Sequence, residues 1–141
     1  MDRQGSTDEQ LADVPLFAGL SKKQLSKISG LMTHVDLEAG TVLVHEGEIG
    51  REFVIVLDGE VEVSRDGEAI AVRRAGDYIG EIALLDNRPR TATVTAKTKV
   101  AVEVLSRAEF SSLLADAPEL SSQIMATIAR RLAELDAEAN P

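Results

Sequence analysis

The stretch from Gly80 to Thr91 contains residue types that bind a phosphorylated sugar. Gly80 precedes Glu81-Ile82-Ala83-Leu84-Leu85, a run suited to one or two helical turns. The first amides of such turns lack internal partners and carry partial positive charge, so they favour an anion. A glycine at that point lets the anion approach the backbone closely. Arg90 then adds a planar, permanently charged fork suited to phosphate, and Thr91 adds a hydroxyl.

Glu81 is the exception in this stretch, because a carboxylate beside an anion site repels the anion. It fits if it accepts hydrogen bonds from hydroxyls that belong to the same ligand, as in a ribose phosphate. Two plainer interpretations exist: Glu81 complements a helix dipole, and Arg90 pairs with an acidic neighbour on the surface. The combined residues favour a nucleotide site.

Residues 35–105 show the pattern of short antiparallel strands that position this stretch. Glycine turn signals punctuate them at fairly regular intervals, and Asp58-Gly59 and Asp66-Gly67 predict two hairpins. We interpret Gly47, Gly50, Gly59 and Gly67 as turn glycines. Phe53 to Leu57 is continuously apolar and predicts a central strand. The expected class is mainly β with flanking helices, as a double-sheet jelly roll or barrel.

Helices are expected at both ends of the strand region. Ser21 and Ser106 each stand three residues before Gln or Glu, the spacing of a capping box. The first of these helices should end near Thr33. Pro118 predicts the start of a longer helix. That helix carries an apolar stripe formed by Leu120, Ile124, Ile128, Leu132 and Leu135.

Length and composition limit the function classes. The 141 residues fit one domain, and no apolar run is long enough to span a bilayer. The net charge is −9, from 15 Lys and Arg against 24 Asp and Glu, which disfavours nucleic acid as a partner. Cysteine is absent and no signal peptide is visible, so we expect a cytoplasmic protein without disulfides.

The stretch resembles a known motif. Gly80-Glu81-Ile82-Ala83-Leu84 followed by Pro89-Arg90-Thr91-Ala92-Thr93 is similar to the phosphate-binding cassette of cyclic nucleotide-binding domains. This family includes bacterial cyclic AMP receptor proteins and kinase regulatory subunits. Pro15 to Ser21, Gly40 to Leu43, and Val56 to Val61 also resemble its segments. The resemblance implies a β-roll with N-terminal helices and two C-terminal helices, with a flexible lead at 1–10 and the domain at 11–137.

The resemblance also implies roles for individual residues. Gly80, Ile82 and Ala83 would offer backbone N–H groups, Glu81 would accept the ribose 2′-hydroxyl, and Arg90 would bind the cyclic phosphate. Thr91 and Ala92 would lie near phosphate or purine. A hydroxyl at position 91 is compatible with cyclic AMP and with cyclic GMP, so it leaves the base open. The long terminal helix would cover the base as a lid, with Arg130, Arg131 and Leu132 as candidates.

The function implied is a cyclic nucleotide sensor, with cyclic AMP preferred to cyclic GMP. Binding would rearrange the cassette against Phe110 and Leu113 and shift the C-terminal helices. We expect no catalytic or DNA-binding domain, no metal, no membrane and no nucleic acid. The chain would act on a separate effector protein, as a stand-alone sensor or an excised domain. It would be a monomer or a homodimer through the C-terminal helix.

Two alternatives remain. The same fold could be a protein-interaction module with little nucleotide affinity. A cupin-like metalloenzyme is disfavoured, because His34 and His45 are the only histidines and lack the clustered spacing of a metal site. No catalytic residues are expected.

Overall fold

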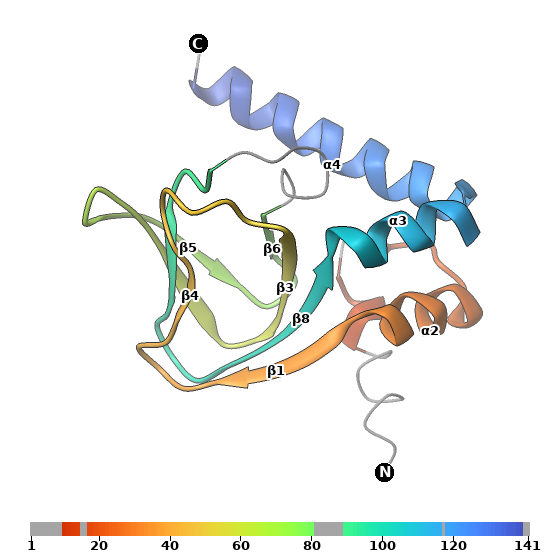
Figure 1. Cartoon of the computed structure of the whole chain (residues 1–141), viewed down its shortest axis with the longest axis horizontal. Helices are drawn as coiled ribbons and strands as arrows, with labels where there is room; N and C mark the ends of the chain where they lie inside the picture. The colour runs from red at the N-terminus through yellow and green to blue at the C-terminus, as the bar shows by residue number, and fades with distance from the viewer. Residues whose placement is uncertain (1–9, 15–16, 81–88, 117, 140–141) are drawn as a thin grey trace.

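A computed structural model describes residues 10–14, 17–80, 89–116 and 118–139 of the chain. Two four-stranded antiparallel sheets form a roll, and helices gather at one end of it (Figure 1). The first sheet has the order β1-β8-β3-β6, formed by Thr33–Leu37, Val100–Ser106, Glu52–Asp58 and Tyr78–Ile79. The second has the order β2-β7-β4-β5, formed by Val42–Val44, Thr93–Ala96, Glu60–Arg65 and Glu68–Arg74. The predicted class, mainly β with flanking helices, is confirmed.

The helices that flank the roll include α2 at Lys22–Leu31, α3 at Arg107–Asp116 and α4 at Pro118–Ala139, and residues 10–12 are also helical. The Ser21 capping box is present, and α2 ends two residues before the predicted Thr33, where β1 begins. The Ser106 capping box is also present: the Ser106 N–H donates to Glu109 Oε1 and the Glu109 N–H donates to Ser106 Oγ. None of the described helices has the length and apolarity needed to cross a membrane.

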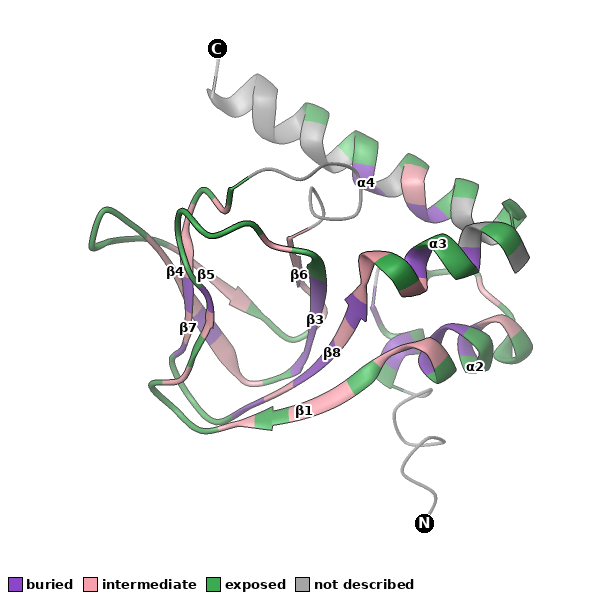
Figure 2. Cartoon of the chain, in the orientation of Figure 1, coloured by how far each residue is buried: buried purple, intermediate pink, exposed green. Residues whose placement is uncertain are grey.

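Strand β3 serves two hydrophobic cores, which explains why its sequence is continuously apolar. Side chains alternate between the faces of a strand, and both faces are covered here. Val54 and Val56 point into the core between the two sheets, whereas Phe53, Ile55 and Leu57 point into a second core beneath the helices. The prediction of a central, buried strand at 53–57 is confirmed, and Figure 2 shows it buried along its length.

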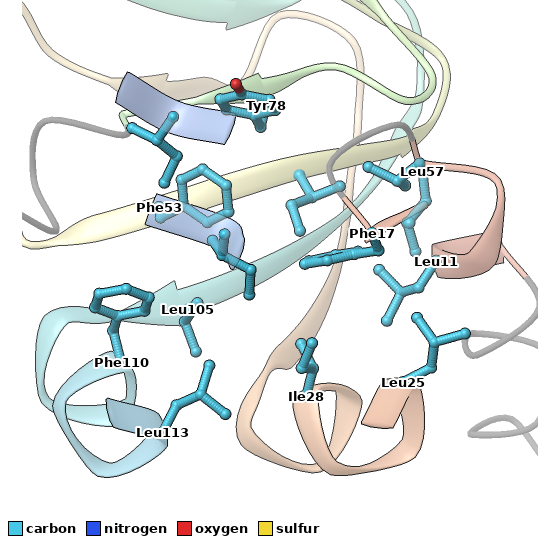
Figure 3. Close-up of a cluster of buried hydrophobic side chains, with 14 residues drawn as sticks. Leu11, Phe17, Leu25, Ile28, Phe53, Leu57, Tyr78, Leu105, Phe110 and Leu113 are labelled. Carbon is cyan, nitrogen blue, oxygen red and sulfur yellow. The ribbon is translucent and has the colours of Figure 1, made fainter. Parts of the chain in front are cut away.

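The second core, which we call the helix core, joins the roll to the helices at both ends of the chain. Figure 3 shows Phe53 and Leu105 of the first sheet facing Ile28 of α2 and Leu113 of α3. Ile124 and Ile128 of α4 belong to the same cluster and are at most 4% exposed. The described part of the predicted α4 stripe is therefore buried against the roll. A displacement of α4 from the roll would expose this surface at a cost of roughly 25 cal/mol per Å².

The two predicted hairpins have different outcomes. Asp66-Gly67 does form the turn between β4 and β5, which pair from Arg65↔Glu68 to Glu60↔Arg74. Asp58-Gly59 does not form a hairpin, because β3 lies in the first sheet and β4 in the second. The prediction was wrong because a glycine with positive φ serves a corner as well as a hairpin. Gly59 has φ +87 and passes so close to the Lys99 carbonyl that a Cβ would overlap it.

Candidate functional site

The backbone at Arg90 is fixed by the loop that connects β2 to β3. The Arg90 N–H donates to the Glu48 carbonyl at 2.7 Å, and the Gly47 N–H donates to the Arg90 carbonyl at 2.8 Å. An isolated antiparallel bridge joins the adjacent residues Ile49 and Pro89. Gly47 has φ +87, in the region that favours glycine, so the loop can turn sharply at this contact. These bonds set the position from which the Arg90 side chain extends.

The Arg90 side chain passes between two glycines that are distant in sequence. A Cβ built on Gly50 would overlap Arg90 Nε, and a Cβ built on Gly80 would overlap Arg90 Nη1. The Arg90 Nη2 group donates to the Glu52 carbonyl at 2.6 Å, at the start of β3. Gly80 has φ +80 and directly follows β6, the strand paired with β3. The pairing of β3 with β6 thus brings Gly80 close to Glu52. Arg90, ten residues after Gly80 in the sequence, contacts both of them.

This geometry changes the assignment of Gly50. The sequence predicts a turn glycine at Gly50, but its φ lies outside the left-handed region. Glycine is needed there because a side chain would overlap the Arg90 side chain. No signal in the sequence separates it from the other loop glycines, because its contact with Arg90 exists only after β2 and β7 have paired. Gly50 is therefore a residue of the candidate site that sequence reasoning missed.

Gly50→Ala is expected to weaken ligand binding while leaving most of the stability intact. The new methyl group overlaps the guanidinium, so Arg90 must move and lose its bond to the Glu52 carbonyl. Loss of a well-placed charged donor costs about 1.5 kcal/mol, or roughly tenfold in Kd. The unfolding free energy should fall by no more than about 1.5 kcal/mol, because the variant loses one hydrogen bond of the folded chain while alanine fits the backbone at Gly50. Calorimetric titration with cyclic AMP, the ligand that the resemblance implies, and urea denaturation measure the two quantities.

Gly59→Ala is the matched control, since it adds the same methyl group at a corner remote from Arg90. Its positive φ and the overlap with the Lys99 carbonyl predict a loss of about 1–3 kcal/mol in stability. Ligand affinity at a temperature where the protein stays folded should be unchanged. Equal affinity losses in both variants would contradict the role given to Gly50.

The remaining predicted site residues differ in what the structure says of them. Thr91 is exposed and its carbonyl accepts a hydrogen bond from Arg65 Nε at 3.0 Å, and Ala92 is half-buried just before β7. Arg130 is exposed on α4. Outside the described residues or side chains lie Glu81, Ile82, Ala83, Arg131 and Leu132. Gly80, Arg90, Thr91 and Ala92 are therefore the predicted residues whose surroundings are known.

The two histidines do not come together. His34 Nδ1 lies 2.7 Å from Glu103 Oε1, and His34 Nε2 lies 3.0 Å from Asp36 Oδ1, so carboxylates occupy both ring nitrogens. Glu103 is 2% exposed, and β1 pairs with β8 so that His34 stands opposite it. His45 is exposed after β2. In the described part of the chain, no group of three His, Cys, Asp or Glu residues is arranged to hold a metal ion.

Comparisons with known proteins show the family to which this chain belongs. The model of the cyclic nucleotide-binding domain family matches residues 34–117. The cAMP-dependent protein kinase regulatory subunit of Yarrowia lipolytica is 41% identical over 114 residues, which is 79% of this chain and 30% of that protein. The chain thus spans less than a third of the length of this relative.

Solved structures share the fold over nearly the whole chain. The structure of cAMP-bound PfPKA-R superposes with a TM-score of 0.82 at 28% identity, over 96% of this chain and 45% of that one. The regulatory subunit of a cAMP-independent protein kinase A from Trypanosoma brucei superposes with a TM-score of 0.77 at 25% identity, over 92% and 47% of the two chains. The match of the family model covers the roll from β1 to the end of α3, and the chain belongs to the cyclic nucleotide-binding domain family.

Proposed function

We propose that this chain is a cyclic nucleotide sensor in which Arg90 binds the cyclic phosphate. The observation that carries the proposal is the guanidinium set between Gly50 and Gly80 and oriented by the Glu52 carbonyl. A guanidinium presents its N–H donors in a fixed plane, which matches the oxygens of a phosphodiester. Local donors of this kind must dominate binding, because the net charge of −9 opposes the approach of an anion.

The remaining ligand contacts follow the order of residues in the cassette. Glu81 accepts the ribose 2′-hydroxyl, and the amides of Ile82 and Ala83 join that of Gly80 around the phosphate. Thr91 and Ala92 lie beside the phosphate or purine. The proposed positions of Thr91 and Ala92 are supported by the backbone bonds of Arg90, which fix the chain just before β7 begins at Thr93. Lid contacts from Arg130, Arg131 or Leu132 of α4 complete the proposed site.

Cyclic AMP is the preferred ligand in this proposal and cyclic GMP the second. The preference is supported by the cAMP-dependent kinase subunit that is 41% identical and by the cAMP-bound structure with the same fold. Titrating the protein with cyclic AMP and cyclic GMP in parallel measures it. A lower Kd for cyclic AMP is expected, and a lower Kd for cyclic GMP would reverse the assignment.

The signal passes through the helix core. Phe110 and Leu113 of α3 pack with Phe53 of the roll and with Ile124 and Ile128 of α4, so a change at one end of this cluster alters the packing of the other. Ligand binding shifts α3 and α4 between two arrangements, to the extent that the ligand binds one of them more tightly. Hydrogen exchange in 107–139 should change on adding cyclic AMP. Unchanged exchange with saturating ligand would contradict this step.

A protein-interaction role with little nucleotide affinity is the second candidate. It is favoured by one observation: a structure with the same fold belongs to a cAMP-independent kinase regulatory subunit. Calorimetric titration separates the candidates. Saturable heat with one of the two nucleotides supports the sensor, and no heat with either at millimolar concentration supports the interaction module.

A further inference from the structure

Glu46, which has no part in the predicted ligand contacts, makes two hydrogen bonds that link separate segments of the roll. Its carboxylate Oε1 accepts from the Asp66 N–H at 3.0 Å, at the turn between β4 and β5. Its own N–H donates to Thr93 Oγ1 at 3.1 Å, at the start of β7. The Arg65 Nε group donates to the Thr91 carbonyl at 3.0 Å. We call Glu46, Arg65, Asp66, Thr91 and Thr93 the Glu46 network.

The network holds the segment that follows Arg90. Thr91 and Thr93 lie one and three residues after Arg90, and Gly47, the neighbour of Glu46, donates its N–H to the Arg90 carbonyl. The strands alone do not provide these ties, because β7 begins only at Thr93. Figure 2 shows β4 and β7 side by side, and the pairing Ser64↔Thr93 brings the turn of the β4–β5 hairpin next to this segment.

The carboxylate of Glu46 accepts a hydrogen bond from a backbone N–H group of the turn, that of Asp66. Asp66 has φ +53, the left-handed conformation that non-glycine residues adopt only at a cost. An acceptor oxygen on its N–H stabilises that conformation and fixes the hairpin turn relative to the β2–β3 loop. Arg65, one residue earlier, is then placed to hold the Thr91 carbonyl.

We infer that Glu46 is a positioning residue for the phosphate-binding arginine, an inference that rests on the proposed function. Glu46 connects the turn of the β4–β5 hairpin to the β2–β3 loop, whose Gly47 holds the Arg90 carbonyl, and to β7 at Thr93, three residues after Arg90. It acts through an acceptor oxygen and not through its charge, because a negative charge in this region disfavours an anionic ligand. The hairpin turn thereby becomes part of the phosphate site without touching the ligand.

The test compares three single variants by titration with cyclic AMP. Glu46→Ala removes the acceptor and should weaken binding by roughly threefold to tenfold, the range expected for one hydrogen bond. Glu46→Gln keeps an acceptor and loses the charge, so its affinity should lie within about twofold of the wild type or be tighter. Glu48→Ala is the matched control, because it removes the same charge from the same loop, and the contacts of Glu48 with Arg90 and His45 among the described residues are made by its backbone.

A double-mutant cycle with Arg90 distinguishes positioning from a general structural effect. In an Arg90→Ala background, Glu46→Ala should change affinity by less than about twofold, because the side chain it positions is absent. An equal loss in both backgrounds, or no loss from Glu46→Ala where Arg90→Ala does weaken binding, overturns the inference alone. Unchanged affinity in Arg90→Ala overturns the proposed function and the inference with it.

Discussion

Arg90→Ala is expected to weaken cyclic AMP binding by about 3 kcal/mol, roughly 150-fold in Kd. The substitution removes the charged fork that is oriented by the Glu52 carbonyl and accommodated by Gly50 and Gly80. Hydrogen bonds between charged groups in a partly buried site are among the strongest in proteins, so their loss exceeds the effect of any other single site residue described. Calorimetric titration or competition binding measures the change.

Two controls separate geometry from charge. Arg90→Lys keeps the positive charge but loses the planar fork, so its affinity should fall between those of the wild type and Arg90→Ala. Arg51→Ala removes an exposed positive charge from the β2–β3 loop, and it should change Kd by less than about threefold, as expected for a screened surface charge. Equal losses in Arg51→Ala and Arg90→Ala would show that only net charge matters and would contradict the assigned contact.

Phe53→Ala is expected to lower the unfolding free energy by about 3–5 kcal/mol, the largest stability effect among the variants described. Phe53 is 1% exposed in the helix core, and its ring centroid lies 5.4 Å from that of Tyr78 at an interplanar angle of 47°. Truncation removes this aromatic contact and leaves a cavity between the first sheet and the helices. Urea denaturation followed by circular dichroism measures the loss.

Ile70→Ala is the matched control for Phe53→Ala, since it truncates an apolar strand residue of the other sheet. Ile70 is 51% exposed on β5, so its truncation should cost less than about 1 kcal/mol. Phe53→Leu retains most of the volume and should fall between the two. A loss below about 1 kcal/mol in Phe53→Ala would contradict the position of Phe53 between sheet and helices.

The elements of the fold were predictable where local chemistry determines them. The capping boxes at Ser21 and Ser106 depend on residues three positions apart, and both form as predicted. The apolar run at 53–57 predicts a buried strand, because a strand that is covered on both faces has apolar residues at every position. Asp66-Gly67 makes the predicted hairpin because its two strands lie in one sheet.

The sequence was less informative where distant segments meet. Asp58-Gly59 has the same local signal as Asp66-Gly67, yet it turns a corner between sheets, because the strand order is decided by packing and not by the turn. Gly50 looked like another turn glycine, and its contact with Arg90 depends on the bridge between Ile49 and Pro89. The network around Glu46 is likewise made by three segments that converge only in the folded chain.

The candidate site was predictable in its residue types and only partly in its geometry. Gly80 and Arg90 could be selected from their order in the cassette, and the structure brings them together. The carbonyl that orients the guanidinium belongs to Glu52, a residue with no distinguishing signal in the sequence. Backbone groups contribute to a site through their position, which residue identity does not encode.

The contact on which the proposed function depends most is the one between the Arg90 guanidinium and the cyclic phosphate. Its most direct test is the ¹H–¹⁵N spectrum of the arginine side chains during titration with cyclic AMP, with Arg90→Lys used to assign the Arg90 Nε–H signal. The Arg90 Nε–H signal should shift progressively and stop shifting when one ligand is bound per chain. Saturable binding of cyclic AMP that leaves the Arg90 signal unmoved would contradict this contact.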